Sequence, residues 1–406
     1  MTLRTRLART MRSTLPLTLV APALVGAVSI TLSANAPALA SPAPVPTPSE
    51  DKALPLVAKP KVYVIPMKGQ LGTDIHVDIY KKIIEDARKV KPDFIVFDMD
   101  SSDLPKSMLL EDPGDRREEW GIMDYDHIRT MVRALREDLG DVPQVMWVED
   151  AFGASSLVAL AWPNLYMANQ ARFGGLGGAI ANIKARYSQE DVEAKMVAAT
   201  AGGILGILEK GGYPTALGEA LIYPEQVLSA SFEGRKVNFR NDLEGQWLID
   251  TSKDHAVSFR ATTAEDVGLS DGNADTFSDL MFLLGYREFE QIDSGQKLFD
   301  DYVQDWRRAM EKVREYYNDS QETGGDLKGL QQAKSLLEKA LTLLERYPAI
   351  EMRLGLPALK VKLDIDRLKE EINGIKRQEK ETGRPGGRSG GGGGGRSAPG
   401  NGPGSR

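Results

Sequence analysis

Cysteine is absent from the 406-residue sequence, and histidine occurs only three times. The absence of cysteine excludes disulfide bonds, thiolate metal sites and cysteine nucleophiles. The histidines, His76, His127 and His255, are widely spaced and show none of the ligand spacings that are typical of metal sites. We therefore expect no metal and no cofactor, and a catalytic triad that uses a histidine has no support in this pattern.

A basic excess is also absent, because the chain carries a formal net charge of −7 at pH 7. Binding of nucleic acid needs clustered Lys and Arg to neutralise phosphates, so we exclude nucleic acid as a partner. Hydrophobic residues make up 41% of the chain, which is enough to bury a sizeable core. The length fits one large domain plus an appendage.

Long apolar runs are missing from the chain after its first 40 residues. This first segment carries four arginines in a basic region: Arg4, Arg6, Arg9 and Arg12. An apolar stretch at residues 15–32 and an A-x-A sequence that ends at Ala40 follow, which is the pattern of a secretory signal peptide. We expect cleavage after Ala40 and export to a periplasmic or other extracytoplasmic location. Retention of the apolar stretch as an N-terminal anchor is the alternative, which the prolines within it disfavour.

Alternating strand and helix patterns begin after a proline-rich linker at residues 41–60. Residues 61–67 and 93–97 are apolar runs typical of buried strands, and residues 73–90 between them carry apolar side chains at helical spacing. A strand, a helix and a strand in this order predict a right-handed parallel crossover. Because further helix and strand patterns follow at residues 125–168, we predict an α/β layered core with parallel strands.

Two segments depart from this regular pattern. Residues 101–123 are polar and punctuated by proline, which predicts a long surface insertion. Residues 179–211 are rich in small side chains and predict helical structure that is interrupted near Gly202 and Gly203.

One stretch in the middle of the chain organises the candidate site. An apolar strand at residues 144–148 is followed by small residues that include Ser155 and Ser156, then by a short apolar helix and a strand at residues 165–168. This order holds a serine hydroxyl at a helix N-terminus, where backbone N–H groups are exposed. A glycine-rich segment, residues 173–178, comes next.

The composition changes toward the C-terminus, where charged amphipathic segments begin. Residues 299–317, 327–347 and 358–376 repeat apolar side chains at helical spacing, which predicts a helical hairpin or coiled-coil module over residues 294–380. A charge run is usually a solvated helix face, so we expect self-packing or contacts between copies rather than a foreign partner. Residues 381–406 are rich in Gly, Ser, Pro and Arg and predict a disordered tail.

Four segments within residues 61–286 keep the order and spacing of a known family. They read KVYVIPMKGQLG, KPDFIVFDMDSSD, PQVMWVEDAFGASSLVALAWPNLYMANQARFGGLG and FRATTAEDVGLSDGNADTFSDLMFLLG. They resemble the ClpP/crotonase-fold serine peptidases, in the branch that contains signal peptide peptidase A and the NfeD-type membrane-bound serine proteases. The resemblance implies a layered spiral of parallel βαβ units over residues 61–293.

The resemblance also implies a serine peptidase with a serine–lysine dyad and no catalytic histidine. The nucleophile corresponds to Ser155, since Ala154-Ser155 matches the Ala-Ser pair of the family. Ser156 is the second candidate. An ungapped alignment anchored at Met167 instead places Gly153 or Ala154 at this position, which departs from the family pattern.

The base of such a dyad is a lysine. A serine becomes a nucleophile only when a base takes its proton, and a lysine can serve when burial lowers its pKa. The lysine of the NfeD-type branch corresponds to Lys195. It lies beside Met196 and shares a helix face with the apolar residues Val192 and Ala199. The alternative is a lysine at the edge of an amphipathic helix with its ammonium in water. Lys184 is the second candidate.

The oxyanion site implied by the resemblance lies after the second strand, where the family has a Gly-Gly turn. Asp100, Ser101 and Ser102 take these positions here, so backbone N–H groups near Ser101 and Ser102 would bind the oxyanion while Asp100 adds a negative charge. An ordinary polar turn is the alternative. Gly174 and Gly175 would form the other wall of the cleft, where glycine lets a substrate backbone approach closely. A plain turn is the alternative there.

By the resemblance, the sequence predicts an exported serine peptidase that cleaves hydrophobic segments of a peptide or protein substrate near a membrane and assembles as a homo-oligomer. The alternative is a catalytically inactive member of the fold that binds peptides or scaffolds a complex. The missing glycines and the ambiguous position of the serine favour this alternative. A crotonase-like acyl-CoA enzyme has the least support, because the chain is predicted to be exported and shows no recognisable CoA-binding signal.

Overall fold

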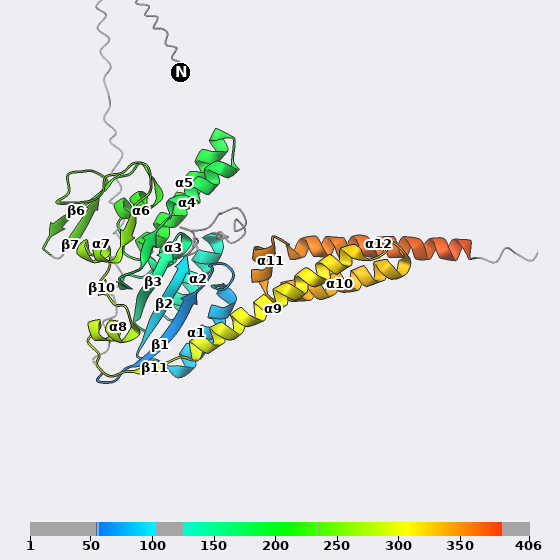
Figure 1. The fold of residues 1–406 in the computed structure, drawn as a ribbon, viewed down its shortest axis with the longest axis horizontal. Coiled ribbons are helices and arrows are strands. Elements are labelled where there is room, and N and C mark those ends of the chain that lie inside the picture. Colours follow the sequence, from blue (N-terminus) through cyan, green and yellow to red (C-terminus); the bar gives the residue numbers. More distant parts are fainter. Residues whose placement is uncertain (1–53, 55–56, 103–124, 235, 384–406) are drawn as a thin grey trace, which may run out of the picture. The chain divides into compact units, whose positions relative to one another are not determined.

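The computed structural model describes residues 54, 57–102, 125–234 and 236–383 of the chain (Figure 1). The predicted signal peptide and most of the predicted linker lie outside the described residues. So do the predicted insertion from residue 103 onward and the glycine-rich tail from residue 384 onward. Within the described residues, no helix combines the length and the apolar character needed to cross a membrane.

Strands and helices alternate through the first two thirds of the described chain, and helices follow. The strands are β1 (Lys61–Lys68), β2 (Phe94–Ser102), β3 (Gln144–Phe152), β4 (Leu165–Met167), β5 (Arg172–Gly174), β6 (Leu228–Glu233), β7 (Lys236–Arg240), β8 (Trp247–Asp250), β9 (Ser258–Arg260), β10 (Gly272–Asn273) and β11 (Glu290–Ile292). The helices are α1 (Val77–Val90), α2 (Tyr125–Asp138), α3 (Ala154–Ala159), α4 (Gly177–Arg186), α5 (Glu190–Lys210), α6 (Thr215–Ile222), α7 (Ala261–Asp266), α8 (Phe277–Leu283), α9 (Ser294–Glu322), α10 (Leu327–Arg346), α11 (Pro348–Leu354) and α12 (Ala358–Thr382).

The central sheet has the strand order β10-β4-β3-β2-β1-β11, and each neighbouring pair in it is parallel. Strand β5 extends the sheet by pairing parallel with the end of β3 and antiparallel with β9. A separate small sheet pairs β6 antiparallel with β7 and β8. The predicted α/β class with parallel strands is therefore confirmed, and β2 and β3 run several residues further than the apolar pattern indicated.

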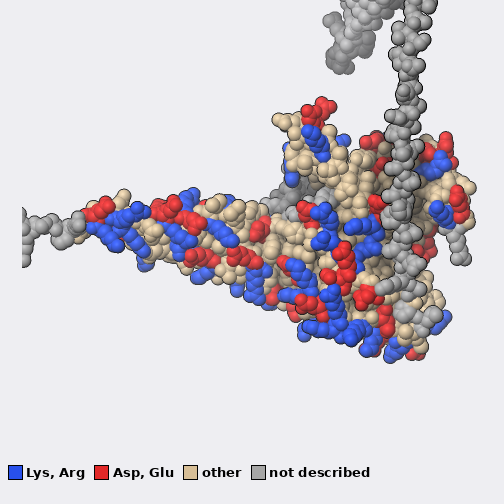
Figure 2. Space-filling model, turned by 180° about the vertical axis from the view of Figure 1, so that it is seen from behind, with Lys and Arg blue, Asp and Glu red and all other residues tan. Residues whose placement is uncertain are grey.

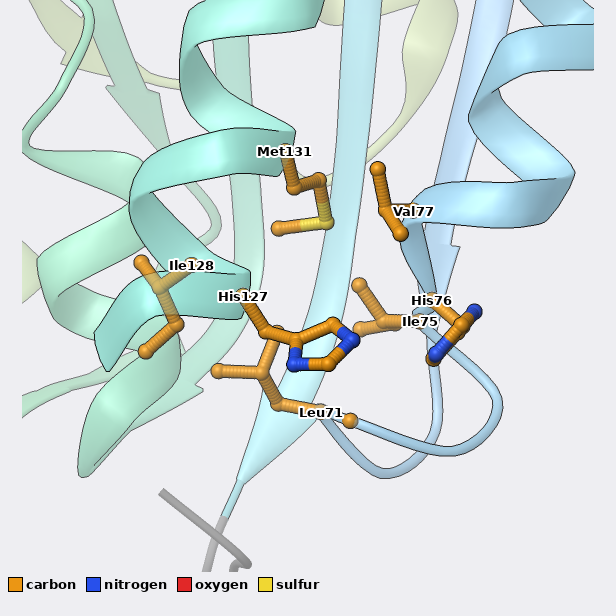
Figure 3. Close-up of a pocket in the computed structure, with 8 residues that line it drawn as sticks. Leu71, Ile75, His76, Val77, His127, Ile128 and Met131 are labelled. Carbon is orange, nitrogen blue, oxygen red and sulfur yellow. The ribbon is translucent and has the colours of Figure 1, made fainter. Parts of the chain in front are cut away.

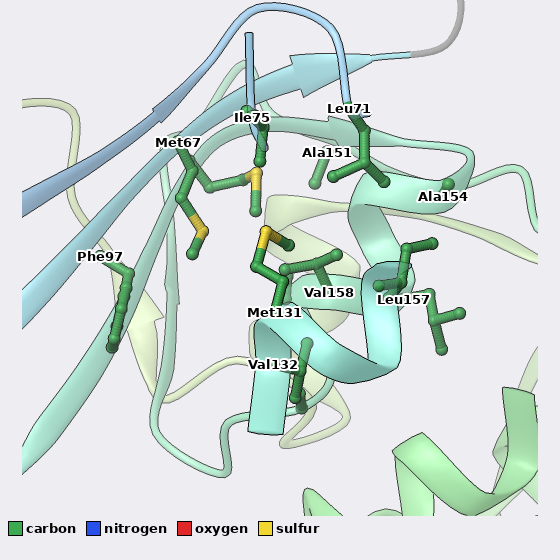
Figure 4. Packing of buried hydrophobic residues seen from close by; sticks show 14 of the residues in the cluster. Met67, Leu71, Ile75, Phe97, Met131, Val132, Ala151, Ala154, Leu157 and Val158 are labelled. Atoms are coloured by element: carbon green, nitrogen blue, oxygen red, sulfur yellow. The ribbon is translucent and has the colours of Figure 1, made fainter. Parts of the chain in front are cut away.

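The alternation of side chains along β1 produces the layers around this sheet. Tyr63, Ile65 and Met67 lie in the main core with helices α1, α2 and α3, whereas Val62 lies in a second core with Trp147 and helix α8. Successive side chains of a strand point to opposite faces, so both faces are covered by helices. Figure 4 shows the side chains that join β1 and β2 to α2 and α3 in the main core: Met67, Phe97, Met131, Val132, Leu157 and Val158.

Helices α4 and α5 differ from the prediction for this segment. The break between them covers residues 187–189, and Gly202 and Gly203 lie inside α5 without interrupting it. A glycine inside a helix costs about 1 kcal/mol relative to alanine. Helix α5 tolerates this cost because its second half is anchored in the core by four buried side chains: Ala201, Ile204, Ile207 and Leu208.

The predicted C-terminal helical module is confirmed as helices α9 to α12. Helix α9 starts on the α/β core, where Phe299, Tyr302 and Trp306 are buried in the main hydrophobic cluster. Helix α10 packs against both α9 and α12. Figure 2 shows Lys and Arg interspersed with Asp and Glu over these helices, as expected for solvated helix faces.

Two contacts fix the start of α9 on the α/β core. Gly295 approaches β1 so closely that a Cβ added to it would lie 2.8 Å from the carbonyl oxygen of Val64. Further along the helix, the Arg307 guanidinium donates to both carboxylate oxygens of Asp74 at 2.9 Å. Asp74 is buried in the β1–α1 turn and also accepts from the backbone N–H of Gln70 at 3.1 Å. The helix is therefore held at two points along its length.

We predict that Gly295→Ala lowers the free energy of unfolding by about 1–3 kcal/mol, because the new methyl group overpacks against rigid backbone. The control is Gly202→Ala in α5, where a Cβ meets no atom within 4 Å. This control should raise the free energy of unfolding by about 0.5–1 kcal/mol. Urea unfolding followed by far-ultraviolet circular dichroism measures both changes. Equal stability of Gly295→Ala and the parent would contradict the close approach.

Candidate active site

The turn between β3 and α3 is built on a glycine. Gly153 precedes α3 with φ of 81° and ψ of −136°, a backbone conformation that residues other than glycine rarely adopt. Its backbone N–H donates to the carbonyl oxygen of Gly174 at 2.7 Å. In hydrolases with a strand, a sharp turn and a helix, the nucleophile occupies this strained turn position. The position carries no side chain here.

The two candidate serines lie further on, inside α3. The Ser155 hydroxyl donates to the carbonyl oxygen of Ser101 at 2.7 Å and contacts that of Phe152 at 3.1 Å. The Ser156 hydroxyl donates to the carbonyl oxygen of Gly153 at 2.7 Å and contacts that of Gly174 at 2.9 Å. Both side chains are fully buried. Because a carbonyl oxygen does not act as a base, these bonds stabilise the turn and do not activate either hydroxyl.

The two candidate lysines are exposed. Lys184 lies in the last turn of α4, and Lys195 lies in the first half of α5, where the side chains around it are exposed or half-buried. No hydrogen bond or ion pair among the described residues joins either lysine to Ser155 or Ser156. The helix is buried only from Ala201 onward, so the apolar face predicted around Lys195 does not dock on the core. The structure does not bring the serine and the lysine together, and the dyad stays a prediction.

The predicted oxyanion turn is part of a strand. Asp100, Ser101 and Ser102 belong to β2 and pair with residues 150–152 of β3, after a register shift between Met99 and Asp100. The expectation of a turn at these residues was therefore wrong, because the pairing with β3 continues past the apolar part of β2. The Ser101 side chain is buried and the Ser102 hydroxyl accepts from Arg172 at 3.1 Å.

Other parts of the protein pack directly against Gly174 and Gly175, the glycines predicted to line the cleft. A Cβ at Gly175 would lie 2.6 Å from the ring of Phe152, and a Cβ at Gly174 would lie 2.9 Å from Ser258. Both glycines have positive φ, of 80° and 133°. They allow β5 to pack tightly between β3 and β9, so the space beside them is taken by protein side chains and backbone rather than left for a substrate.

An ion pair between the half-buried Arg172 and the buried Asp150, which the sequence interpretation missed, lies at the ends of β3 and β5. The Arg172 guanidinium donates to both carboxylate oxygens of Asp150, at 3.0 and 2.5 Å, and the Arg172 backbone N–H adds a third bond at 3.1 Å. Asp150 is buried, and its hydrogen bond to Arg172 raises the pKa of the guanidinium further. An acidic residue within an otherwise apolar strand was the available signal, because a buried carboxylate needs a cationic partner.

A second charged cluster joins β1, β2 and β3. The Lys68 ammonium lies 2.7 Å from Asp98 and 3.0 Å from Glu149. Burial raises the pKa of Asp98 to about 7, because the loss of hydration outweighs the attraction of Lys68 and Glu149 adds repulsion. Burial also acts to lower the pKa of Lys68, but its two carboxylate partners outweigh burial and raise it.

Two of the three histidines meet at a small cavity of about 10 Å³ between the β1–α1 turn and α2 (Figure 3). The rings of His76 and His127 lie 5.2 Å apart between their centroids. His76 Nδ1 accepts from the backbone N–H of Asp78 and caps α1, and burial lowers the pKa of His76 to about 4. His76 is therefore neutral near pH 7 and acts as a helix cap. The described residues contain no cluster of three or more His, Asp or Glu side chains that could hold a metal ion.

Two open grooves lie along α9 at the carboxyl ends of β1 and β2. The Trp306 groove, of about 570 Å³, lies between the β1–α1 turn, α9 and α11, and its lining includes Gln70, Ser102, Trp306, Met310 and Arg353. The Lys68 groove, of about 520 Å³, is lined by residues that include Lys68, Phe299, Val303 and Gln304. Asp74, Arg307 and Arg308 line both grooves, which therefore meet at the Asp74–Arg307 ion pair.

No family model matches this chain, and no curated protein matches it. Among solved structures, the chain is similar to a lysine-to-alanine mutant of the 1510-N membrane-bound stomatin-specific protease in complex with a substrate peptide. The TM-score is 0.35 and the identity 18%, over 56% of this chain and 80% of that chain. It is also similar to the 1510-N membrane protease specific for a stomatin homolog from Pyrococcus horikoshii, with a TM-score of 0.32 and 17% identity over 55% and 79% of the two chains.

A peptidase from Plasmodium falciparum also matches, with a TM-score of 0.30 and 12% identity over 52% of this chain and 95% of that chain. The resemblance predicted from the sequence is thus found among solved structures at low identity. At TM-scores below 0.5 this likeness carries no conclusion about the site, which depends on the geometry of this chain alone.

We predict that Arg172→Gln lowers the free energy of unfolding by about 2–3 kcal/mol, because it leaves the buried carboxylate of Asp150 without its charged donors. The control is Arg240→Gln, since Arg240 pairs with Asp242 at 2.8 Å but both side chains are about two-fifths exposed, at 41% and 42%. Arg240→Gln should lower the free energy of unfolding much less than Arg172→Gln, because exposed ion pairs stabilise a fold only weakly. Urea unfolding compares the two variants. Similar losses in both would contradict a special role for the buried pair.

We predict that Asp98 makes stability fall as the pH rises from about 4 to about 7. In this range the folded carboxyl keeps a proton that the unfolded chain has released, so the folded state is disfavoured progressively. The effect of one group is at most about 1.4 kcal/mol per pH unit. Urea unfolding at several pH values should show this fall as a difference between the parent and Asp98→Asn. A pH-independent difference would refute the raised pKa.

Proposed function

We propose that this chain binds a peptide along α9 and does not hydrolyse it. The absence of hydrolysis is inferred from Gly153, the residue at the strained turn position, which has no hydroxyl. The nearby hydroxyls of Ser155 and Ser156 are buried and donate to main-chain carbonyls. A serine peptidase needs a nucleophile, a base and oxyanion donors around one substrate position, and these residues supply none of the three in contact with an open groove.

The position of the grooves supports peptide binding. In parallel α/β sheets, ligands bind outside the carboxyl ends of the strands, and the grooves include Lys68 and Ser102, the last residues of β1 and β2. Along α9 the lining residues run from Phe299 to Glu311. At about 1.5 Å per residue this part of the helix is roughly 18 Å long. About five residues of an extended peptide would span it, at about 3.3 Å per residue.

The chemistry of the lining also fits a peptide. Val303 and Met310 are half-buried and offer apolar surface for side chains, while Gln70 and Gln304 offer donors and acceptors for a peptide backbone. Export, predicted from residues 1–40, and assembly of several copies are parts of the same proposal and would place the peptide ligand outside the cytoplasm. Proximity to a membrane stays a prediction.

Hydrolysis by Ser155 is the rival function. It would require Ser155 to leave the carbonyl oxygen of Ser101 and become accessible, and it would require Lys195 to leave water and reach the hydroxyl. Both movements oppose hydrogen bonding or solvation that the folded chain already has. The binding function requires neither movement.

A serine-reactive fluorophosphonate and a fluorescein-labelled peptide separate these functions. The peptide is a hexapeptide of Ser, Val and Ala that ends in Leu-Leu with a carboxylate. We expect the parent, Ser155→Ala and Lys195→Ala to show equally little labelling and equal binding of the peptide by fluorescence anisotropy. Mass spectrometry should find the peptide intact after long incubation.

Two results would overturn parts of this proposal. Labelling or cleavage that disappears in Ser155→Ala would show that the chain is a serine hydrolase. Absence of saturable binding of the hexapeptide would refute the peptide-binding part. Ser155→Ala is a mild change for binding, because its effect is the loss of one buried hydrogen bond, worth about 1 kcal/mol of stability.

A further inference from the structure

We propose that the Trp306 groove recognises the C-terminal carboxylate of the bound peptide, with Arg308 as the cationic partner, the Trp306 Nε1–H as a second donor and the half-buried Met310 receiving the last side chain. This inference rests on the proposed peptide-binding function and names the part of the ligand that the site selects. It depends on the C-terminal helices, since all three residues belong to α9.

The charges in the groove leave one guanidinium without a partner among the described residues. Arg307 is paired with Asp74 through two bonds of 2.9 Å, and Glu311 is paired with Arg314 at 3.3 Å. Arg308 is exposed, and neither a hydrogen bond nor an ion pair connects it to the part of the chain that the structure describes. Because Arg308 lines both grooves, its positive charge lies where they meet.

A second observation comes from Trp306. Its side chain is 3% exposed, and its buried Nε1–H has no acceptor among the residues that the structure describes. A buried donor without an acceptor costs about 1–3 kcal/mol, so a missing acceptor is informative at a residue that lines a groove. An oxygen of a bound ligand would satisfy this donor after a small shift of the side chains that cover it. The unsatisfied N–H and the unpaired guanidinium both favour a ligand that carries oxygen acceptors.

A carboxylate fits this environment better than a phosphate. The planar guanidinium binds a carboxylate through two parallel N–H···O bonds. Asp74 and Glu311 also line the groove, and their negative charges would repel a dianion more strongly than a monoanion. The half-buried Met310 lines the same groove, so the preferred carboxylate belongs to a chain end with an apolar side chain.

The test compares two forms of the fluorescein-labelled hexapeptide ending in Leu-Leu, one with a terminal carboxylate and one with a terminal amide. We expect amidation to weaken binding to the parent about tenfold or more, as measured by fluorescence anisotropy. Arg308→Gln should weaken binding of the carboxylate form by a similar factor and leave the amide form unchanged. Lys312→Gln is the matched control, because Lys312 is an exposed cation of α9 that lines neither groove.

Two further variants sharpen the assignment. Arg308→Lys keeps the charge but loses the paired donors, so binding of the carboxylate form should lie between the parent and Arg308→Gln. Trp306→Phe keeps an aromatic ring but removes the N–H, and we expect it to weaken the carboxylate form about threefold or more while the amide form changes less. Thermal unfolding checks that each variant is folded.

The outcomes distinguish this inference from the proposed function. Equal binding of both peptide forms, or an equal loss in Arg308→Gln and Lys312→Gln, would overturn carboxylate recognition while peptide binding stands. Binding of neither form would overturn both. Equally tight binding of an amidated peptide that ends in Glu would also overturn the inference, because the groove would then select any carboxylate and not a chain end.

Discussion

The parallel pairing between the ends of β2 and β3 is the interaction on which the candidate site depends. After the register shift at Met99 and Asp100, the two strands stay paired as far as Ser102 and Phe152. This pairing presents the carbonyl oxygen of Ser101 to the hydroxyl of Ser155. It also places Ser102 at the mouth of the Trp306 groove. The same short stretch of paired strands thus holds the serine turn and contributes to the lining of the Trp306 groove.

The position of the hydroxyls around this turn is the basis of the proposed function. A hydrolase stores strain at a turn so that a reactive hydroxyl stays exposed. Here the strained position is Gly153, and the nearby hydroxyls of Ser155 and Ser156 have become internal hydrogen-bond donors. The polar groups that stay accessible lie on the other side of the strand ends, on α9 and the β1–α1 turn. The proposed function therefore relies on recognition by charge, hydrogen bonding and apolar contact.

Local patterns predicted much of the fold. The apolar runs of β1 to β4 and the helical spacing of α1, α2, α9, α10 and α12 are properties of neighbouring residues, which a sequence shows directly. The polar ends of β2 and β3 could not be predicted in this way. Asp100 and Ser102 belong to a strand only because β3 lies beside them, and β-structure depends strongly on such context.

The candidate site was less predictable, because its contacts join distant parts of the chain. The apolar neighbours of Lys195 indicated a buried helix face, but burial of α5 begins only at Ala201. Arg307 and Asp74 are 233 positions apart, and no local pattern indicates that they pair. The grooves exist only because α9 returns to the start of the sheet, so no single segment carried a signal for them.

Because α9 packs on the central sheet, the C-terminal helices are partly built into the main core. The first half of the helix contributes Phe299, Tyr302 and Trp306 to the same cluster that holds the central strands. Only the later helices pack mainly on one another. A chain that ended at residue 293 would thus expose the apolar surface of the main core that α9 covers. The boundary at residue 294 therefore marks a change in composition and not a division into independent folding units.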